Sequence, residues 1–245
     1  MKTTNLIFSS ILASFLFLSP LAAQQSSRWK HVVIGAEGAS YMPIGTLKDR
    51  FKSTFGEAFY AGLETSDKWT WLGKAEYMKF DKVNPDRLRL ERTVNIDGQD
   101  QKVSFPMDRL KMKLEVVSLS LDTKYNLLRT GFLETNLDAG FGFYRWIFHR
   151  DGLDSLSAEV TGANGTGKTV YYSMKKAIAI SQEDWSGGFN VGLEVTLTPF
   201  YPVSLSFSAA YKNIVGELYP ALELEMENVS TFQMFDLKAG LRIKL

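Results

Sequence analysis

The stretch Phe232 to Leu245, "FQMFDLKAGLRIKL", decides the fold of this chain. Every second residue from Phe235 to Leu245 is apolar, and the residues between them are charged or glycine. This period of two predicts a β-strand with one apolar and one strongly polar face. The strand runs to the last residue, where most chains fray, so we expect it to close a larger sheet. A transmembrane β-barrel needs such a closing strand.

Seven further segments alternate in the same way and complete a predicted set of eight strands. They are His31–Met42, Gly56–Thr65, Lys68–Phe80, Arg109–Asp122, Phe132–Phe148, Trp185–Thr198 and Val203–Lys212. In the fourth strand the alternation breaks at Val116-Val117, where a β-bulge would restore it. Long and short connections follow one another, as in outer-membrane barrels, and the longest are residues 81–108 and 149–184. The sequence therefore predicts an all-β, eight-stranded antiparallel up-and-down transmembrane β-barrel with both termini periplasmic.

The N-terminus has the pattern of a secretory signal peptide. Lys2 precedes the apolar run Leu6 to Leu18, and small residues follow up to Ala23. The run is shorter than the roughly 20 residues that a membrane-spanning helix needs. We expect cleavage after Ala23. Residues 1–23 would then be the signal peptide, residues 24–30 a short periplasmic segment and residues 31–245 the barrel domain.

Composition argues against several other classes of protein. The chain has 28 Lys and Arg against 27 Asp and Glu, and Lys2 is the only charge in the signal peptide, so the mature charges balance. This balance gives no reason to expect nucleic acid as a partner. Cysteine is absent and there are only two histidines, so we expect no disulfide, no metal site and no cofactor. A mean hydropathy of −0.10 is too polar for a helical membrane protein. In a barrel the apolar and polar faces of each strand alternate, so their hydropathies average to a value near zero.

The closing strand also carries a motif. Lys238, Gly240, Ile243 and Leu245 resemble the polar-x-Gly-x-x-apolar-x-apolar signal read by the outer-membrane barrel insertion machinery; Leu245 stands where such proteins usually end in an aromatic residue. Across residues 31–245 the chain resembles the small OmpA, OmpX and OmpW type of outer-membrane barrel. This resemblance implies a Gram-negative cell envelope, a monomer in outer-membrane lipid and lipopolysaccharide, and the insertion machinery as a partner.

The polar faces of the predicted strands carry charges of both signs, which we expect to line the barrel interior. The set is Glu37, Glu64, Lys74, Glu76, Glu115, Glu134, Asp138, Glu194, Lys212, Asp236, Lys238 and Arg242. Lone charges are costly in a narrow lumen, so these residues should pair. An eight-stranded barrel is just wide enough for its own side chains. We therefore expect a plugged lumen and a structural or surface-interaction role; the alternative is an OmpW-like narrow conduit for small or hydrophobic molecules.

One cluster suggests chemistry. His149 lies at the predicted extracellular rim of the fifth strand, near Arg150, Asp151, Asp154, Ser155 and Ser157. A second alternative is therefore a lipid A-modifying outer-membrane enzyme with a rim histidine, a serine and an acid. Polar residues fill any external loop, so we expect no enzymatic activity.

The segment 162–169, "GANGTGKT", satisfies the phosphate-binding pattern G-x-x-x-x-G-K-[ST] in full. In a nucleotide-binding protein this loop joins a parallel strand to a helix. Here it lies in a long polar connection of an all-β chain. We interpret it as the turn of a hairpin around Asn164-Gly165.

Overall fold

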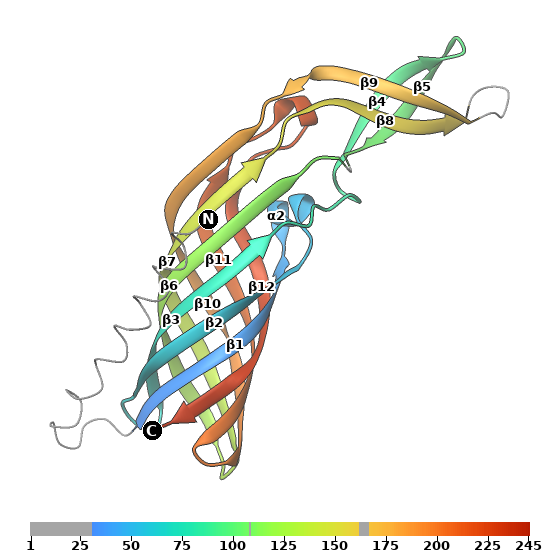
Figure 1. Ribbon diagram of the computed structural model, residues 1–245. Coiled ribbons are helices and arrows are strands. Elements are labelled where there is room, and N and C mark those ends of the chain that lie inside the picture. Colours follow the sequence, from blue (N-terminus) through green and yellow to red (C-terminus); the bar gives the residue numbers. More distant parts are fainter. Residues whose placement is uncertain (1–30, 108, 162–166) are drawn as a thin grey trace, which may run out of the picture.

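The computed structural model describes residues 31–107, 109–161 and 167–245 (Figure 1). The predicted signal peptide and the segment 24–30 lie outside the described residues. Eight antiparallel strands close into a barrel in the spatial order β1-β12-β11-β10-β7-β6-β3-β2. They are β1 (His31–Pro43), β2 (Thr54–Glu64), β3 (Trp69–Phe80), β6 (Met112–Arg129), β7 (Leu133–Arg150), β10 (Ile180–Phe200), β11 (Val203–Leu218) and β12 (Val229–Lys244). Barrel strands that follow one another in sequence are neighbours in the wall, which confirms the predicted up-and-down barrel.

The C-terminal strand β12 closes the barrel, as its alternation predicts. It pairs with β11 on one side and with β1 on the other, from Val33 opposite Lys244 to Pro43 opposite Met234. Backbone hydrogen bonds between Val32 and Leu245, with N···O distances of 3.1 and 2.8 Å, extend the seam to the last residue. Closure pairs both edges of the sheet, as a wall inside hydrocarbon requires.

The two longest connections are partly folded into hairpins. Residues 81–108 contain β4 (Arg89–Ile96) and β5 (Gln99–Pro106), and residues 149–184 contain β8 (Leu153–Thr161) and β9 (Gly167–Ala177). The first hairpin turns at Asp97-Gly98, whose φ angles of 54° and 83° suit a two-residue turn. Figure 1 shows both hairpins projecting beyond the end of the barrel that lies opposite the C-terminus. We call this the hairpin end and the other the short-turn end.

Several wall strands are longer than predicted, because the barrel continues beyond the part that alternates between apolar and charged. Strands β6 and β7 have 18 residues each and β10 has 21. The predicted bulge is wrong: the register of β6 with β3 and with β7 runs through Val116-Val117 without a shift. What changes there is the environment. Leu114 and Val116 are buried inside the barrel, whereas Glu115 lies outside it.

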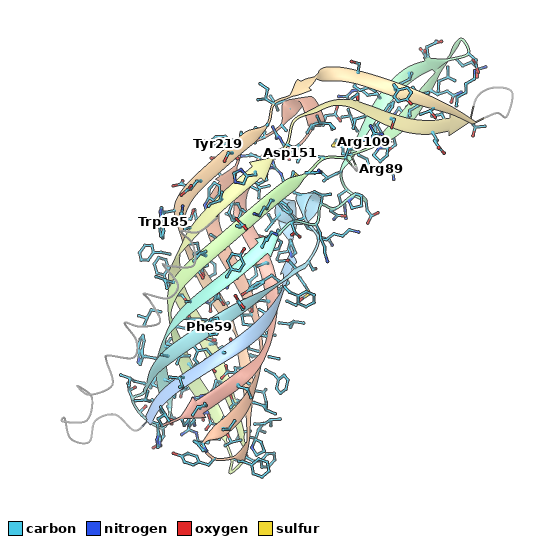
Figure 2. The ribbon with its side chains drawn as sticks, viewed as in Figure 1. Phe59, Arg89, Arg109, Asp151, Trp185 and Tyr219 are labelled. Carbon is cyan, nitrogen blue, oxygen red and sulfur yellow. The ribbon has the colours of Figure 1, made fainter. Side chains whose placement is uncertain are left out.

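A belt of exposed apolar side chains surrounds the barrel toward its short-turn end. Its most exposed members include Phe59, Leu119, Leu121, Phe141, Phe143, Leu193, Leu237 and Leu241. Figure 2 shows Trp185 at the outer side of the wall. On β7 the belt runs from Leu133 to Phe143, which spans about 25 Å along the axis at a rise of about 3.3 Å per residue and a tilt of about 40°. That height matches the apolar band of a membrane barrel.

Aromatic residues mark the border of this belt at the short-turn end, which we call the lower end of the barrel. Trp69, Trp71, Phe132, Phe200 and Tyr201 are all exposed at the short-turn end. Such residues are enriched where a barrel wall meets the membrane surface. Among the described residues no helix is long and apolar enough to cross a membrane.

Above the belt the barrel reverses its polarity and holds an apolar core. Its central members are Leu47, Phe51, Met78, Phe80, Leu114, Trp146, Phe148, Phe232 and Met234, all buried, and we call this set the apolar cap. The ring of Phe51 lies 5.9 Å from that of Phe80 and 6.4 Å from that of Phe148. Phe51 follows the short helix α2 (Gly45–Arg50), which Figure 1 shows at the mouth of the barrel. The cap therefore fills the barrel at its hairpin end.

Candidate functional site

The structure places most of the predicted interior charges on the inner face of the wall. Eleven of the twelve are buried, with exposed fractions of 7% or less: Glu37, Glu64, Lys74, Glu76, Glu134, Asp138, Glu194, Lys212, Asp236, Lys238 and Arg242. Each occupies an inward position of its strand, because side chains alternate between the two faces of the sheet. Below the apolar cap these residues form three clusters along the barrel axis.

Glu115 is the exception, and its predicted interior position is wrong. Its carboxylate lies on the outer face of β6, accepts a hydrogen bond from the Tyr77 hydroxyl at 3.1 Å and pairs with Lys113 at 2.8 Å. Its side chain is 28% exposed. The prediction depended on a bulge that would have changed the parity of the strand. Without the bulge Glu115 stays on the outer face, at a level of β6 that lies beyond the apolar belt and faces water.

The upper cluster consists of Glu76, Lys212, Asp236 and Lys238. Glu76 accepts hydrogen bonds from both lysines. Asp236 lies 3.6 Å from the Lys212 ammonium and 3.3 Å from that of Lys238. Every side chain in this cluster is at most 5% exposed. Two cations and two anions thus neutralise each other directly beneath the apolar cap.

The middle cluster is built around Lys74. Its ammonium lies 2.6 Å from Asp122 and 3.9 Å from Asp138. Asn190 donates to Asp122 at 3.4 Å. Gly140 faces this cluster, and a Cβ there would lie 2.1 Å from the Asp122 carboxylate. Only glycine at this position leaves room for the ion pair between Lys74 and Asp122. Glu37 is buried nearby on β1, and its Oε2 has no hydrogen-bond partner among the described residues.

The lower cluster lies at the short-turn end and comprises Glu64, Lys124, Arg129, Glu134, Glu194, Arg242 and Lys244. Arg242 is only 2% exposed and lies between two carboxylates, 3.6 Å from Glu134 and 3.8 Å from Glu194. Glu194 also accepts a hydrogen bond from Lys124. Lys244 pairs with Glu134 at 2.6 Å and closes the cluster toward the end of the barrel.

Four charges of these clusters were missing from the sequence prediction: Asp122 and Lys124 in the interior, and Arg129 and Lys244 at its short-turn end. The first three lie on β6. Its predicted end at Asp122 placed Lys124 and Arg129 in a turn, although β6 continues to Arg129. Lys244 continues the polar face of the closing strand, so its alternation was a sufficient signal. With these residues included, eight carboxylates face seven cations, and β12 supplies three of the cations.

Above the cap, Arg50 ties helix α2 to the last connection of the chain. Its guanidinium donates to the carbonyl oxygens of Glu227 at 2.5 Å and Tyr219 at 3.2 Å. It also lies 5.9 Å from the ring of Phe148 in the apolar cap. Burial and the neighbouring guanidinium of Arg150 lower the pKa of Arg50 to about 10, which leaves it charged at neutral pH. These contacts hold α2 across the mouth of the barrel.

The residues of the enzyme alternative are not assembled into a site. His149 is exposed on the outer face of β7, opposite Lys113 and Ser181, and its side chain has no hydrogen bond or ion pair with the described residues. Ser155 and Ser157 lie on β8, beyond the wall, and the side chain of Asp154 lies outside the described set. No group of His, Cys, Asp and Glu in the described part of the chain could hold a metal ion.

The phosphate-loop pattern lies at the tip of the second hairpin. Gly167 to Thr169 begin β9 and pair with residues 159–161 of β8. Residues 162–166 lie outside the described residues. Two antiparallel strands therefore flank this segment, as the hairpin interpretation expects, and not the strand and helix of a nucleotide-binding loop.

No protein family and no curated protein matches the sequence. The fold is similar to that of Neisserial surface protein A, with 14% identity over 87% of this chain and 97% of that chain and a TM-score of 0.46. It is similar to Ail, the attachment invasion locus protein of Yersinia pestis, with 10% identity over 88% and 97% and a TM-score of 0.41. A major outer membrane protein from Thermus thermophilus matches at 10% identity over 87% and 99%, with a TM-score of 0.52. This last likeness shows that the chain has the closed β-barrel fold found in bacterial outer-membrane proteins.

Proposed function

We propose that this chain is a monomeric outer-membrane protein with a structural and surface-interaction role: a sealed barrel that carries a projecting pair of hairpins. One observation carries the proposal. The interior charges other than Glu37 pair with one another inside the barrel, and the apolar cap fills the hairpin end above them. A solvated conduit needs a polar path along its whole length, so this filling supports a plug over the OmpW-like alternative.

The two ends of the barrel support an orientation. The short-turn end carries both termini of the described chain and the aromatic border, and outer-membrane barrels keep their short turns in the periplasm. We therefore infer that both termini are periplasmic and that the hairpins face outward among lipopolysaccharide. Lys238, Gly240, Ile243 and Leu245 lie on the seam strand or directly after it, where the insertion machinery would meet the end of the chain.

The hairpins form a stiff platform suited to contact with a partner. The ring of Phe105 on β5 lies 5.6 Å from that of Tyr172 on β9. Lys168 pairs with Asp97 at 2.6 Å, which joins the tips of the two hairpins. Because these contacts order the hairpins in advance, a partner would bind without the full entropic cost of ordering a loop.

Planar-bilayer recording tests the plug. We expect no steady ion current from the folded protein, with insertion verified by the heat-modified shift of the barrel on a gel. A reproducible unitary current would overturn the plug and establish the conduit.

Cysteine labelling tests the orientation, because the chain has no cysteine of its own. Gln99→Cys, at the exposed turn of the first hairpin, should react in intact cells with a maleimide too large to pass the outer membrane. Gly131→Cys, in an exposed short turn with no atom within 4 Å of its Cβ position, should react only after permeabilisation. The reverse pattern would invert the proposed orientation.

A further inference from the structure

The outer wall of the barrel has a groove that breaks the apolar belt. The groove has a volume of about 350 Å³ and lies across β2, β3 and β6. Leu63, Trp71 and Leu121 form its walls, and Thr65 lies at the end toward the short turn. We propose that this groove holds the acyl chain of one glycerophospholipid, whose phosphate is bound by Lys68.

The groove exists because Gly73 has no side chain. Gly73 is exposed on the outer face, and its register partners are Ala61 on β2 and Leu121 on β6. A Cβ added at Gly73 would have a single neighbour within 4 Å, the carbonyl oxygen of Ala61 at 3.8 Å. An outward glycine beside a small residue leaves a channel between large apolar side chains, and a flexible hydrocarbon chain can fill it.

The polar end of the lipid is matched at the turn between β2 and β3. Lys68 is exposed there, and its ammonium lies 5.8 Å from the centre of the Tyr125 ring. That ring packs on Trp69 with centroids 4.9 Å apart, so the cation lies within the aromatic border of the belt. Gly73 and Trp69 are four residues apart on β3, about 13 Å along the strand. The groove and the cation are therefore separated by a distance that one lipid spans.

The chemistry of the occupant follows from this arrangement. The groove is continuous with a surface that the membrane covers, so its occupant is hydrocarbon. The exposed cation at the short-turn end of the groove, Lys68, selects a phosphate over an uncharged head group, with an attraction near the surface that corresponds to about fivefold in affinity. The inference rests on the proposed membrane position of the barrel, and it predicts a lipid held by specific residues rather than a freely exchanging one.

Lipid retention by the folded barrel tests the proposal. The protein is folded in vesicles of phosphatidylglycerol and phosphatidylethanolamine, extracted into a mild detergent and weighed by native mass spectrometry. We expect one phospholipid to be retained by the unaltered protein. Gly73→Leu fills the groove and should reduce retention at least about tenfold, since each displaced methylene corresponds to about fourfold in affinity. Lys68→Gln should reduce retention about fivefold and remove any preference for a phospholipid over diacylglycerol.

Gly38→Leu is the matched control. Gly38 is also outward and exposed, on β1, and its Cβ position has no atom within 4 Å. This variant should retain lipid as the unaltered protein does. Insertion without a retained lipid, or equal retention in both leucine variants, would overturn the groove and leave the proposed function standing. Failure of the unaltered protein to insert into vesicles would overturn both.

Discussion

Removing the charge of Glu76 should destabilise the barrel far more than removing that of Glu115. Both glutamates belong to the set that alternation assigned to the interior, but only Glu76 lies there. Glu76 accepts hydrogen bonds from Lys212 and Lys238, and all three side chains are at most 5% exposed. Glu76→Gln keeps the volume, so no cavity forms. It leaves two buried cations facing one carboxylate, that of Asp236.

The magnitude follows from the burial of these groups. Removing one partner from a buried ion pair costs about 3–5 kcal/mol, because the other charge stays desolvated and uncompensated. A cost of this size changes the unfolding equilibrium by roughly 150- to 5,000-fold. Glu115 and its partner Lys113 are 28% and 39% exposed, and a surface pair of this kind contributes about 0–1 kcal/mol. Glu115→Gln is therefore the matched control.

Urea unfolding in lipid vesicles measures both variants, with the fluorescence of the five tryptophans as one probe and the heat-modified gel shift as another. The double variant Glu76→Gln with Lys238→Met identifies the cause of the loss. It removes one cation and leaves Lys212 paired with Asp236, so it should be about 2 kcal/mol more stable than Glu76→Gln alone. A difference below about 1 kcal/mol between Glu76→Gln and Glu115→Gln would refute the interior charge balance. A double variant no more stable than the single one would assign the loss to packing.

Three further predictions concern other levels of the barrel. Arg242→Ala should lower the free energy of unfolding by about 2–3 kcal/mol, since Glu134 and Glu194 keep other cationic partners; an unchanged heat-modified gel shift would count against this. Phe51→Ala should cost about 3–5 kcal/mol in the same urea measurement, because the ring is fully buried between two others; a loss under about 1 kcal/mol would show that the cap packs loosely. Gly140→Val should reduce the yield of folded barrel, because its Cβ would collide with Asp122; equal yields for it and for Gly131→Val, in an open turn, would contradict this.

The sequence alone determined the barrel and most of its interior, because both depend on a local rule. Side chains alternate between the faces of a strand, so a charge at every second position marks a face that must avoid hydrocarbon. Residues such as Glu37, Lys74 and Arg242 could be assigned to the interior in this way, one strand at a time. The seam could be predicted for the same reason. The alternation of the last strand gives it an apolar face that must contact lipid, and inside hydrocarbon both of its edges must form hydrogen bonds with neighbouring strands.

Tertiary structure decided where this rule reverses. On β6 the alternation keeps its register through Val116-Val117. Before this pair the strand has apolar core inside and water outside, and after it the strand has charge inside and hydrocarbon outside. In the sequence alone, that reversal looks like a bulge, and the predicted bulge placed Glu115 inside the barrel. Lys124 was not predicted as an interior charge because the predicted strand ended at Asp122. The apolar cap has the same origin: Phe51, Phe80 and Phe148 come from three distant segments and meet only when the barrel closes. Pairing within the lumen likewise depends on which strands face one another across the axis, and no single strand contains that information.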